Sequence, residues 1–369
     1  MVDKVRLGII GTGQIGTHHM EKYQPIEDAE IVAVADLREG EARRLAEKYG
    51  IPHVYTDYHD LLARDDIQSV DVCLHNRLHM PVTIDALRAG KNVYCEKPMS
   101  WTYSEAQAMA DAAAETGRML HIQLSTLYRP ETRAAKRLID EGHLGTLYYA
   151  KSSGYRRRGR PWVDGYGSAA FVNTATSGGG AMLDVAVYHI ARILYLLGNP
   201  EVLTVSGNTA QMLDMYEDRR ASGAYNVEEL GSGLVRLAGG ITFFVEEAWA
   251  IHSDQGDNEY VYGSKGGVRI DPLAYYTTLA DIEMNATPAD LEHIDWRWHQ
   301  CDPLTTYYSD SQRHWIAAQQ GRVPLLDTAG LALRTSLITE GIYISSHLGR
   351  EVTAEEIAAC EPGLGRGQD

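Results

Sequence analysis

The stretch Val5-Arg-Leu-Gly-Ile-Ile-Gly-Thr-Gly-Gln-Ile-Gly16 decides the fold of the first part of the chain. In it, a short apolar run leads directly into Gly11, Gly13 and Gly16, with the spacing Gly-x-Gly-x-x-Gly. Between a strand and a helix, the first glycine allows a tight turn, the second lets the backbone approach a pyrophosphate, and the third allows close helix–strand packing. The helix N-terminus offers free N–H groups to the phosphates. The stretch therefore predicts a dinucleotide-binding site.

Asp36 indicates which dinucleotide is bound. It follows the next predicted strand, Glu30–Ala35, twenty residues after Gly16. A carboxylate at this place accepts hydrogen bonds from the ribose hydroxyls and repels a 2′-phosphate, so NAD is favoured over NADP. Arg38 favours NADP instead if its guanidinium pairs with that phosphate. Otherwise it is a solvated residue at the start of a helix. We expect NAD, with NADP as the alternative.

Strand and helix patterns alternate as far as residue 126. We predict strands at Val5–Ile10, Glu30–Ala35, Val70–Leu74, Asn92–Cys95 and Met119–Leu124, and helices at Glu39–Tyr49, Pro81–Ala89 and Ser104–Thr116. This alternation is typical of a parallel sheet with right-handed crossovers. Residues 1–126 are therefore expected to form an α/β domain, a doubly wound Rossmann sheet that binds the dinucleotide.

The pattern changes after residue 126. We predict helices at Glu131–Glu141, Gly180–Leu197, Tyr307–Gln320 and Thr328–His347, strands at Leu147–Ser153, Glu201–Asn208, Glu228–Leu237, Ile241–Ile251, Tyr260–Ser264 and Gly267–Ile270, and a hairpin turn within 261–267. Consecutive strands indicate an α+β domain whose largely antiparallel sheet is open on one face. Residues 127–369 are expected to bind substrate and to form the oligomer, a homodimer or homotetramer, because an open sheet face usually needs covering.

The composition limits the partners. A formal net charge of −16 argues against nucleic acid, because phosphate backbones attract clustered Lys and Arg. The chain has no apolar segment of about 18 residues and no basic leader before its first strand, so a cytoplasmic protein without a membrane span is expected. The four cysteines lack a metal-ligand spacing, and Cys73 and Cys95 lie in apolar strand patterns. Buried free thiols and no metal site are therefore expected.

Lys97 follows the predicted strand Asn92–Cys95, in the sequence Cys-Glu-Lys-Pro. Ligands bind at the carboxyl ends of parallel strands, so this lysine is aimed at the site. A partly desolvated lysine has a lowered pKa and exchanges a proton with a substrate oxygen. Pro98 makes a cis peptide bond plausible. The alternative interpretation is an exposed lysine at the beginning of a turn.

Together these motifs resemble the Gfo/Idh/MocA family of NAD(P)-dependent sugar and polyol oxidoreductases over nearly the whole chain. The resemblance rests on the glycine motif with Asp36, on Asn76 and His79, on Ala89–Pro98, on Pro130 to Gly145, and on Ser177–Asp184. It implies a Rossmann domain followed by a substrate domain. The residues expected to contact the cofactor are Gly11, Gly13, Gln14, Ile15, Asp36, Arg38, Asn76, His79, Glu96, Lys97 and Ser125. Ser125 departs from the Asn or Gln that the family usually carries there.

The resemblance also implies that Lys97, Asp184 and Tyr188 surround the reacting carbon. Asp184 and Tyr188 are four residues apart, which places them on one face of a helix. Many members carry His where Tyr188 stands, and this chain is similar to those with tyrosine, whose phenol relays a proton when a nearby cation lowers its pKa. The neighbouring His189 is the alternative acid/base, if the helix is slightly rotated.

An arginine-rich loop, Tyr155-Arg-Arg-Arg-Gly-Arg-Pro-Trp162, is unusual in so acidic a chain. Guanidinium groups suit carboxylate, sulfonate or phosphate, and Trp162 offers a flat face to a sugar ring or a nicotinamide. The alternative is an exposed loop that pairs with acidic neighbours or with a partner subunit. The side chains expected to contact substrate are Tyr128, Tyr155, Arg156, Arg158, Trp162, Asp184 and His189.

Three functions remain open from the sequence. The first is an NAD-dependent dehydrogenase that removes hydride from a secondary alcohol of a sugar or cyclitol, an anionic one included. The second is an NAD-dependent glycosidase related to sulfoquinovosidases, which oxidises a ring hydroxyl, eliminates the aglycone, adds water and returns the hydride. Both need the same residues. The third is a non-catalytic NAD-binding regulator, against which the set of Lys97, Asp184 and Tyr188 argues.

Overall fold

A computed structural model describes residues 4–254 and 256–366. The chain forms two compact units, each built from more than one segment. The first unit comprises the residues up to Ser100, Glu105–Ser125 and Arg297–Ala329, and the second comprises Trp101–Ser104, Thr126–Trp296 and the residues from Gly330 onward. The single domain boundary predicted from the sequence, 126/127, places Arg297–Ala329 in the second domain. These residues join the first unit because Trp315 and Ile316 are buried in its hydrophobic core.

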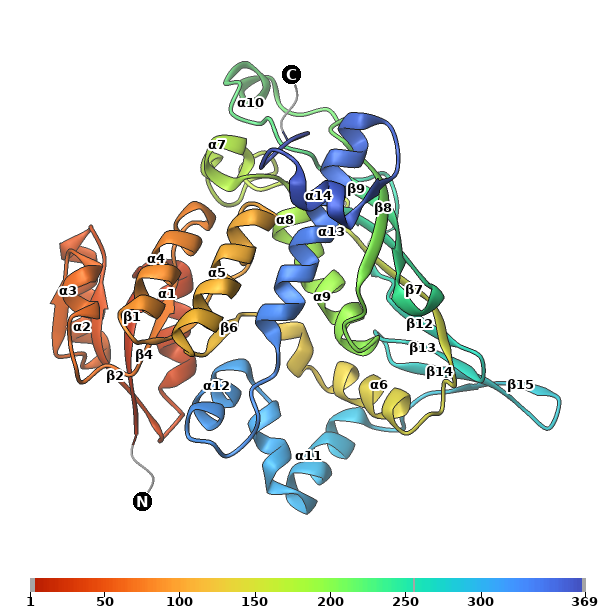
Figure 1. The fold of residues 1–369 in the computed structure, drawn as a ribbon, viewed down its shortest axis with the longest axis horizontal. Coiled ribbons are helices and arrows are strands. Elements are labelled where there is room, and N and C mark those ends of the chain that lie inside the picture. Colours follow the sequence, from red (N-terminus) through yellow and green to blue (C-terminus); the bar gives the residue numbers. More distant parts are fainter. Residues whose placement is uncertain (1–3, 255, 367–369) are drawn as a thin grey trace. The chain divides into compact units, whose positions relative to one another are not determined.

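The first unit is a parallel α/β sheet with the strand order β3-β2-β1-β4-β5-β6, which confirms the predicted doubly wound Rossmann fold. Its elements are β1 (Val5–Ile10), α1 (Gln14–Tyr23), β2 (Ala29–Ala35), α2 (Glu39–Tyr49), β3 (His53–Tyr55), α3 (Tyr58–Leu62), β4 (Ser69–Val72), α4 (Asn76–Arg88), β5 (Asn92–Cys95), α5 (Tyr103–Thr116), β6 (Leu120–Ile122), η4 (Pro303–Tyr308) and α12 (Ser311–Gln319). Figure 1 shows α4 and α5 alongside the sheet. The short strand β3, with its half-buried His-Val-Tyr sequence, was not predicted.

The strands of the first unit are apolar because helices cover both sides of the sheet. Leu7 and Ile9 have no exposed surface, and Val34 and Tyr94 on neighbouring strands belong to the same core cluster. Burial of a side chain of this size contributes roughly 1.5–3 kcal/mol. This rigid sheet fixes the positions of the loops that follow its strands.

The second unit is built on a ten-stranded sheet with the order β15-β14-β13-β12-β7-β10-β9-β8-β16, with β11 paired to β7. Its elements are η1 (Ser125–Tyr128), α6 (Pro130–Asp140), β7 (Leu147–Tyr155), η2 (Ala169–Val172), α7 (Thr174–Ser177), α8 (Ala181–Asp184), α9 (Ala186–Leu196), β8 (Val202–Ala210), α10 (Glu217–Ala221), β9 (Leu230–Leu237), η3 (Ala238–Gly240), β10 (Ile241–Ala248), β11 (Gly256–Asp257), β12 (Tyr260–Gly263), β13 (Gly266–Arg269), β14 (Ala274–Leu279), β15 (Ile282–Ala286), α11 (Leu291–Cys301), α13 (Thr328–Leu348), β16 (Val352–Thr353) and α14 (Ala354–Ala359). The predicted antiparallel character is confirmed, apart from the parallel pair β7 and β10.

The predicted hairpin at 261–267 is confirmed as the pair β12 and β13. Strands β14 and β15 and helix α11 were not predicted. The exposed burial pattern of β15, Ile282–Ala286, gives no alternation of buried and exposed side chains that a sequence analysis could detect.

The two faces of the second sheet differ in exposure. On β10, Phe243 and Val245 have no exposed surface, whereas Phe244 between them is half-exposed. Helices α9 and α13 lie beside the strands in Figure 1, and Ile342 of α13 lies against glycines of β8 and β9, where an added Cβ would come within 3.0 Å. One face of the sheet therefore packs against helices and the other is partly exposed, as predicted for a sheet that is open on one face.

Within residues 4–254 and 256–366, every helix is too short or too polar to cross a lipid bilayer.

The burial of β10 leads to a test with a matched pair of variants. Phe243→Ala removes a fully buried ring and should lower the free energy of unfolding by about 3–5 kcal/mol, whereas Phe244→Ala should cost about 1 kcal/mol. Urea unfolding followed by fluorescence measures both. Equal losses would show that the register of β10 is not as described.

Candidate functional site

In the glycine loop between β1 and α1, the first and third glycines have no room for a side chain, whereas the second has open space beside it. Gly11 has a φ of +97°, and an added Cβ would lie 2.3 Å from the carbonyl oxygen of Cys73. At Gly16, a Cβ would lie 2.0 Å from the carbonyl oxygen of Gly11. At Gly13 the nearest atom to an added Cβ is a guanidinium nitrogen of Arg38, 4.0 Å away. The open space at Gly13 therefore fits the approach of a pyrophosphate, as the motif predicts.

Asp36 and Arg38 form a pair beside this loop. The carboxylate accepts hydrogen bonds from the backbone N–H of Thr12 at 2.8 Å and from its hydroxyl at 2.9 Å. The Arg38 guanidinium also donates to Asp36, with Nε 3.2 Å from Oδ1 and Nη2 3.2 Å from Oδ2. Burial opposes ionisation of Asp36, but these hydrogen bonds outweigh it and hold the pKa of the carboxyl well below its usual range. Arg38 is thus engaged by Asp36 and anchored to the loop.

The other expected cofactor residues follow strands of the same parallel sheet and so lie at its carboxyl edge. Gln14 and Ile15 are exposed at the start of α1, Asn76 begins α4, and Ser125 is exposed after β6. His79 is buried instead, with Nδ1 2.7 Å from the carbonyl oxygen of Pro98 and Nε2 3.0 Å from that of Leu74. Its burial lowers its pKa. The imidazole therefore supports the loop after β5.

Lys97 lies in that loop and is half-buried. Its backbone N–H donates to Oε2 of Glu96 at 3.1 Å, and the Lys97–Pro98 peptide bond is cis, as predicted.

A buried ionic cluster that the sequence analysis missed lies behind the loops. His19 of α1 has no exposed surface, with Nδ1 2.7 Å from Asp71 and Nε2 2.8 Å from Glu96. Tyr23 donates to the same Asp71 at 3.1 Å. Burial disfavours the imidazolium, but interactions with Cys73, Asp71 and Glu96 outweigh it and raise the pKa of His19 well above its usual value. The charged Asp71 within an apolar strand was the available sequence signal.

In the second unit, the predicted helix Gly180–Leu197 is interrupted. Val185, with φ −109° and ψ −39°, separates α8 from α9, so Asp184 ends one helix and Tyr188 lies in the next. Glu228 holds the beginning of α8, because its carboxylate accepts hydrogen bonds from the N–H groups of Gly180 and Met182 at 2.9–3.0 Å. The single helix predicted for Gly180–Leu197 is therefore two consecutive helices, α8 and α9.

Asp184 and His189 are both held by residues at the end of β10. The indole Nε1 of Trp249 donates to Oδ2 of Asp184 at 3.0 Å. Nδ1 of His189 lies 2.8 Å from Oε1 of Glu247. Tyr188 is half-buried, and its carbonyl oxygen accepts a hydrogen bond from the Thr126 hydroxyl at 3.1 Å. Glu247 was not predicted as a site residue, although the alternation along β10 places this carboxylate on the core face.

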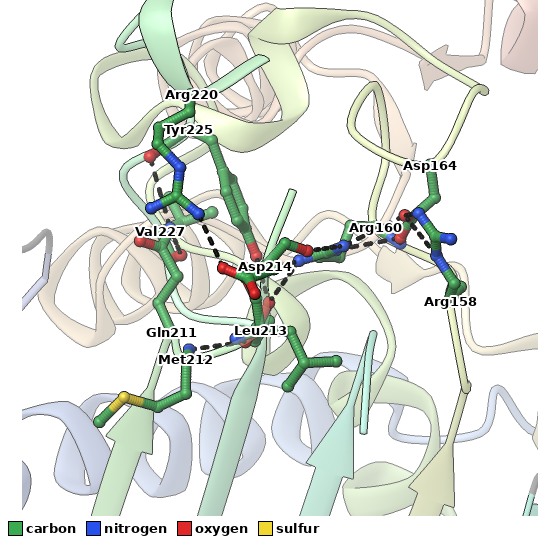
Figure 2. Close-up of polar contacts among 11 residues, drawn as sticks. Arg158, Arg160, Asp164, Gln211, Met212, Leu213, Asp214, Arg220, Tyr225 and Val227 are labelled. Carbon is green, nitrogen blue, oxygen red and sulfur yellow. Dashed lines mark hydrogen bonds and ion pairs between the residues drawn. The ribbon is translucent and has the colours of Figure 1, made fainter. Parts of the chain in front are cut away.

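The arginine-rich loop is tied down by carboxylates (Figure 2). Arg158 donates to Asp164 at 3.2–3.3 Å and its guanidinium lies 5.4 Å from the ring centre of Tyr216. Arg160 is 1% exposed and pairs with Asp164 at 3.0 Å and with Glu229 at 3.1 Å. The same guanidinium donates to two backbone carbonyl oxygens of the segment before α10. These contacts support the interpretation of this loop as one that pairs with acidic neighbours.

The remaining expected substrate residues lie nearby in the same unit. Arg156 donates to the Tyr166 hydroxyl at 3.2 Å. The guanidinium carbon of Arg219 lies over the Trp162 ring, 4.7 Å from the ring centre. Burial and the carboxylate of Glu246 raise the pKa of Tyr155. Tyr128 is buried, with 4% of its surface exposed.

The four cysteines are free thiols, and Cys73 and Cys95 are buried, as expected. Among the described residues, no group of three or more His, Cys, Asp or Glu side chains is arranged to hold a metal ion.

The charge on His19 should be visible in the stability of the protein. Because its folded pKa lies above its unfolded value, its contribution is present below about pH 6.5 and is lost as pH rises through the folded pKa. His19→Gln should lower the free energy of unfolding by about 3 kcal/mol at about pH 6 and by less at higher pH. Urea unfolding between about pH 6 and about pH 9 measures this difference.

His18→Gln is the matched control, since this neighbouring imidazole of α1 is exposed. A loss for His19→Gln that stays constant across the pH range would contradict a charged His19.

Comparison with known proteins places the chain among oxidoreductases. Residues 5–124 match the model of an oxidoreductase family with an NAD-binding Rossmann fold, and residues 132–269 match the GFO/IDH/MocA C-terminal domain. The D-glucoside 3-dehydrogenase of Escherichia coli (strain K12) is 31% identical over 281 residues, which cover 74% of this chain and 79% of that protein. The myo-inositol 2-dehydrogenase of Thermotoga maritima is 25% identical over 279 residues, 76% of this chain and 79% of that one.

Solved structures share the fold. A levoglucosan dehydrogenase in complex with NADH and L-sorbose superimposes with a TM-score of 0.79 at 19% identity, covering 95% of this chain and 99% of that one. GenD2 from gentamicin A biosynthesis, in complex with NAD, gives 0.75 at 24% identity, covering 96% and 97%.

Proposed function

Because the chain belongs to the Gfo/Idh/MocA family of oxidoreductases with an NAD-binding Rossmann domain, we propose that it is a dehydrogenase that oxidises a secondary alcohol of a sugar or cyclitol. The observation that carries this proposal is the 31% identity with a D-glucoside 3-dehydrogenase across both units, together with Lys97 and Asp184 at the expected motifs. The relative named as a myo-inositol 2-dehydrogenase is consistent with the same substrate class.

The first unit holds the cofactor in this proposal. The open space at Gly13 and the N-terminus of α1 receive the pyrophosphate, and Asp36 accepts hydrogen bonds from the adenosine ribose. The bond between Arg38 and Asp36 would have to break before the guanidinium could take a 2′-phosphate, which favours NAD over NADP. NAD supplies the hydride acceptor when it is bound.

Side chains of the protein stabilise the charge on the reacting oxygen and accept the hydroxyl proton. We assign Lys97 to stabilise the oxygen of the reacting alcohol, and Asp184, held by Trp249, to orient the substrate. Either Tyr188 or His189 takes the hydroxyl proton, and the contact between His189 and Glu247 favours His189.

The substrate in this proposal is neutral. An anionic sugar was expected only from the arginine-rich loop. Two of its four arginines, Arg158 and Arg160, are paired with Asp164 and Glu229, and Arg156 donates to the Tyr166 hydroxyl. The oxidoreductive glycosidase needs the same catalytic residues, but the relatives described above are named as dehydrogenases. A net oxidation with release of NADH is therefore proposed.

We also propose that the partly exposed face of the second sheet is covered by another copy of the chain, as a homodimer or homotetramer. Half-exposed aromatic side chains such as Phe244, Tyr260 and Tyr262 support this. Sedimentation as a compact monomer at micromolar concentration would contradict it. The cytoplasmic location stays a prediction.

The dehydrogenase is tested by incubating the protein with NAD or NADP and a panel of methyl glucosides, inositols and aryl glycosides. NADH should accumulate in proportion to the ketone formed, and faster than NADPH. Lys97→Ala should lower kcat by roughly 10²- to 10⁴-fold while NAD binding, followed by fluorescence, changes little.

Lys265→Ala, in the exposed turn between β12 and β13, is the control and should retain full activity. Release of aglycone without NADH would support the glycosidase, and an active Lys97→Ala would remove Lys97 from the mechanism.

A further inference from the structure

Strand β10 carries a carboxylate on the face that packs against the core. Phe243, Val245 and Glu247 alternate along the strand, and each has no exposed surface. The first two are apolar, as a core face requires. A buried carboxylate costs several kcal/mol unless hydrogen bonds compensate it, so its presence needs a reason.

The contacts of Glu247 are directed at one imidazole. Its Oε1 lies 2.8 Å from Nδ1 of His189 and accepts a hydrogen bond from the Ser152 hydroxyl at 3.1 Å. Its Oε2 has no hydrogen-bond partner within the described part of the chain. A buried oxygen without a hydrogen-bond partner calls for an explanation, and a role of the carboxylate exercised through His189 supplies one.

The neighbouring strand leaves room for this pair. A Cβ added to Gly154 of β7 would lie 2.6 Å from Oε2 of Glu247 and 2.6 Å from Cε1 of His189. Gly154 does not have a positive φ, so any residue type could adopt its backbone conformation. The missing side chain therefore provides space for the pair.

We propose that Glu247 is a positioning residue that makes His189 the proton acceptor; this inference rests on the proposed dehydrogenase function. Donation of Nδ1–H to the carboxylate fixes the neutral ring in the tautomer whose Nε2 accepts a proton. The negative charge also stabilises the imidazolium that forms. The alcohol gives its hydroxyl proton to Nε2 and becomes a ketone; NAD, when bound, would supply the acceptor for the carbon-bound hydrogen and its electron pair.

The end of β10 orients a second group in the same way. Trp249, two residues beyond Glu247, is 1% exposed and donates to Asp184 at 3.0 Å. One strand end thus fixes the directions of two side chains on α8 and α9.

The test is a double-mutant cycle measured with NAD and the best substrate of the panel. Glu247→Gln should lower kcat about 100-fold and change KM for the sugar by less than about threefold, because the carboxylate acts through the base. His189→Ala and the double variant should be equally slow, since Glu247 has nothing left to position. Additive losses would overturn the proposal.

The pH profile supplies a readout that a purely structural role would not move. Removing the negative charge beside the imidazole should shift the acidic limb of kcat to lower pH. The titratable groups on the adjoining elements, Tyr155 on β7, Asp184 on α8 and Tyr188 on α9, are unchanged in every variant. An unshifted limb in Glu247→Gln would contradict the proposal.

Glu283→Gln is the matched control, because this carboxylate lies on the fully exposed strand β15. It should keep the wild-type rate and pH profile. Thermal unfolding and NAD binding should be alike in all variants, and Glu247→Asp, which retains the charge, should recover part of the lost rate.

A final measurement does not depend on turnover. In protein labelled with ¹⁵N-histidine, the ring signals missing from His189→Ala identify His189, whose Nδ1 should carry the proton and whose pKa should fall in Glu247→Gln. An unchanged His189 pKa would overturn the proposal even if activity were lost. If the wild-type protein oxidised no sugar, the proposed function would fail, while the ring signals would still decide whether Glu247 controls His189.

Discussion

Carboxylates that are buried or half-buried and accept hydrogen bonds fix the loops of both units. Asp36 holds the glycine loop, and Glu96 holds the loop that carries the candidate lysine. In the second unit, Glu228 holds the first turn of α8, and Glu247 holds an imidazole of α9. A carboxylate removed from water is tolerated only where donors meet it, so each of these groups dictates the positions of the donors around it. The acidic composition of the chain is in part structural.

The Rossmann half was predictable because its signals are local. The spacing of Gly11, Gly13 and Gly16 after an apolar strand determines the turn, and the position of Asp36 follows from the length of one helix and one strand. The carboxyl edge of a parallel sheet then gathers every loop that follows a strand. His19 was missed because its partners, Asp71 and Glu96, are distant in sequence and meet only after folding.

The second half was predicted less well for two physical reasons. The helix is interrupted at Val185, although neither glycine nor proline stands between Asp184 and Tyr188 to indicate a break. The arginine-rich loop was ambiguous because a guanidinium pairs equally well with a ligand or with a carboxylate of the same chain. Arg160 is almost completely buried between two such carboxylates, which no local pattern could indicate.

Because Arg297–Ala329 return to the first unit, they affect both folding during synthesis and the expression of this unit as a separate fragment. Trp315 and Ile316 complete a core whose other members lie near the N-terminus, so a ribosome must release most of the chain before that core can close. A fragment cut at residue 126 would leave this apolar surface facing water. Expression of the dinucleotide-binding half by itself would therefore require the late helix to be grafted onto its end.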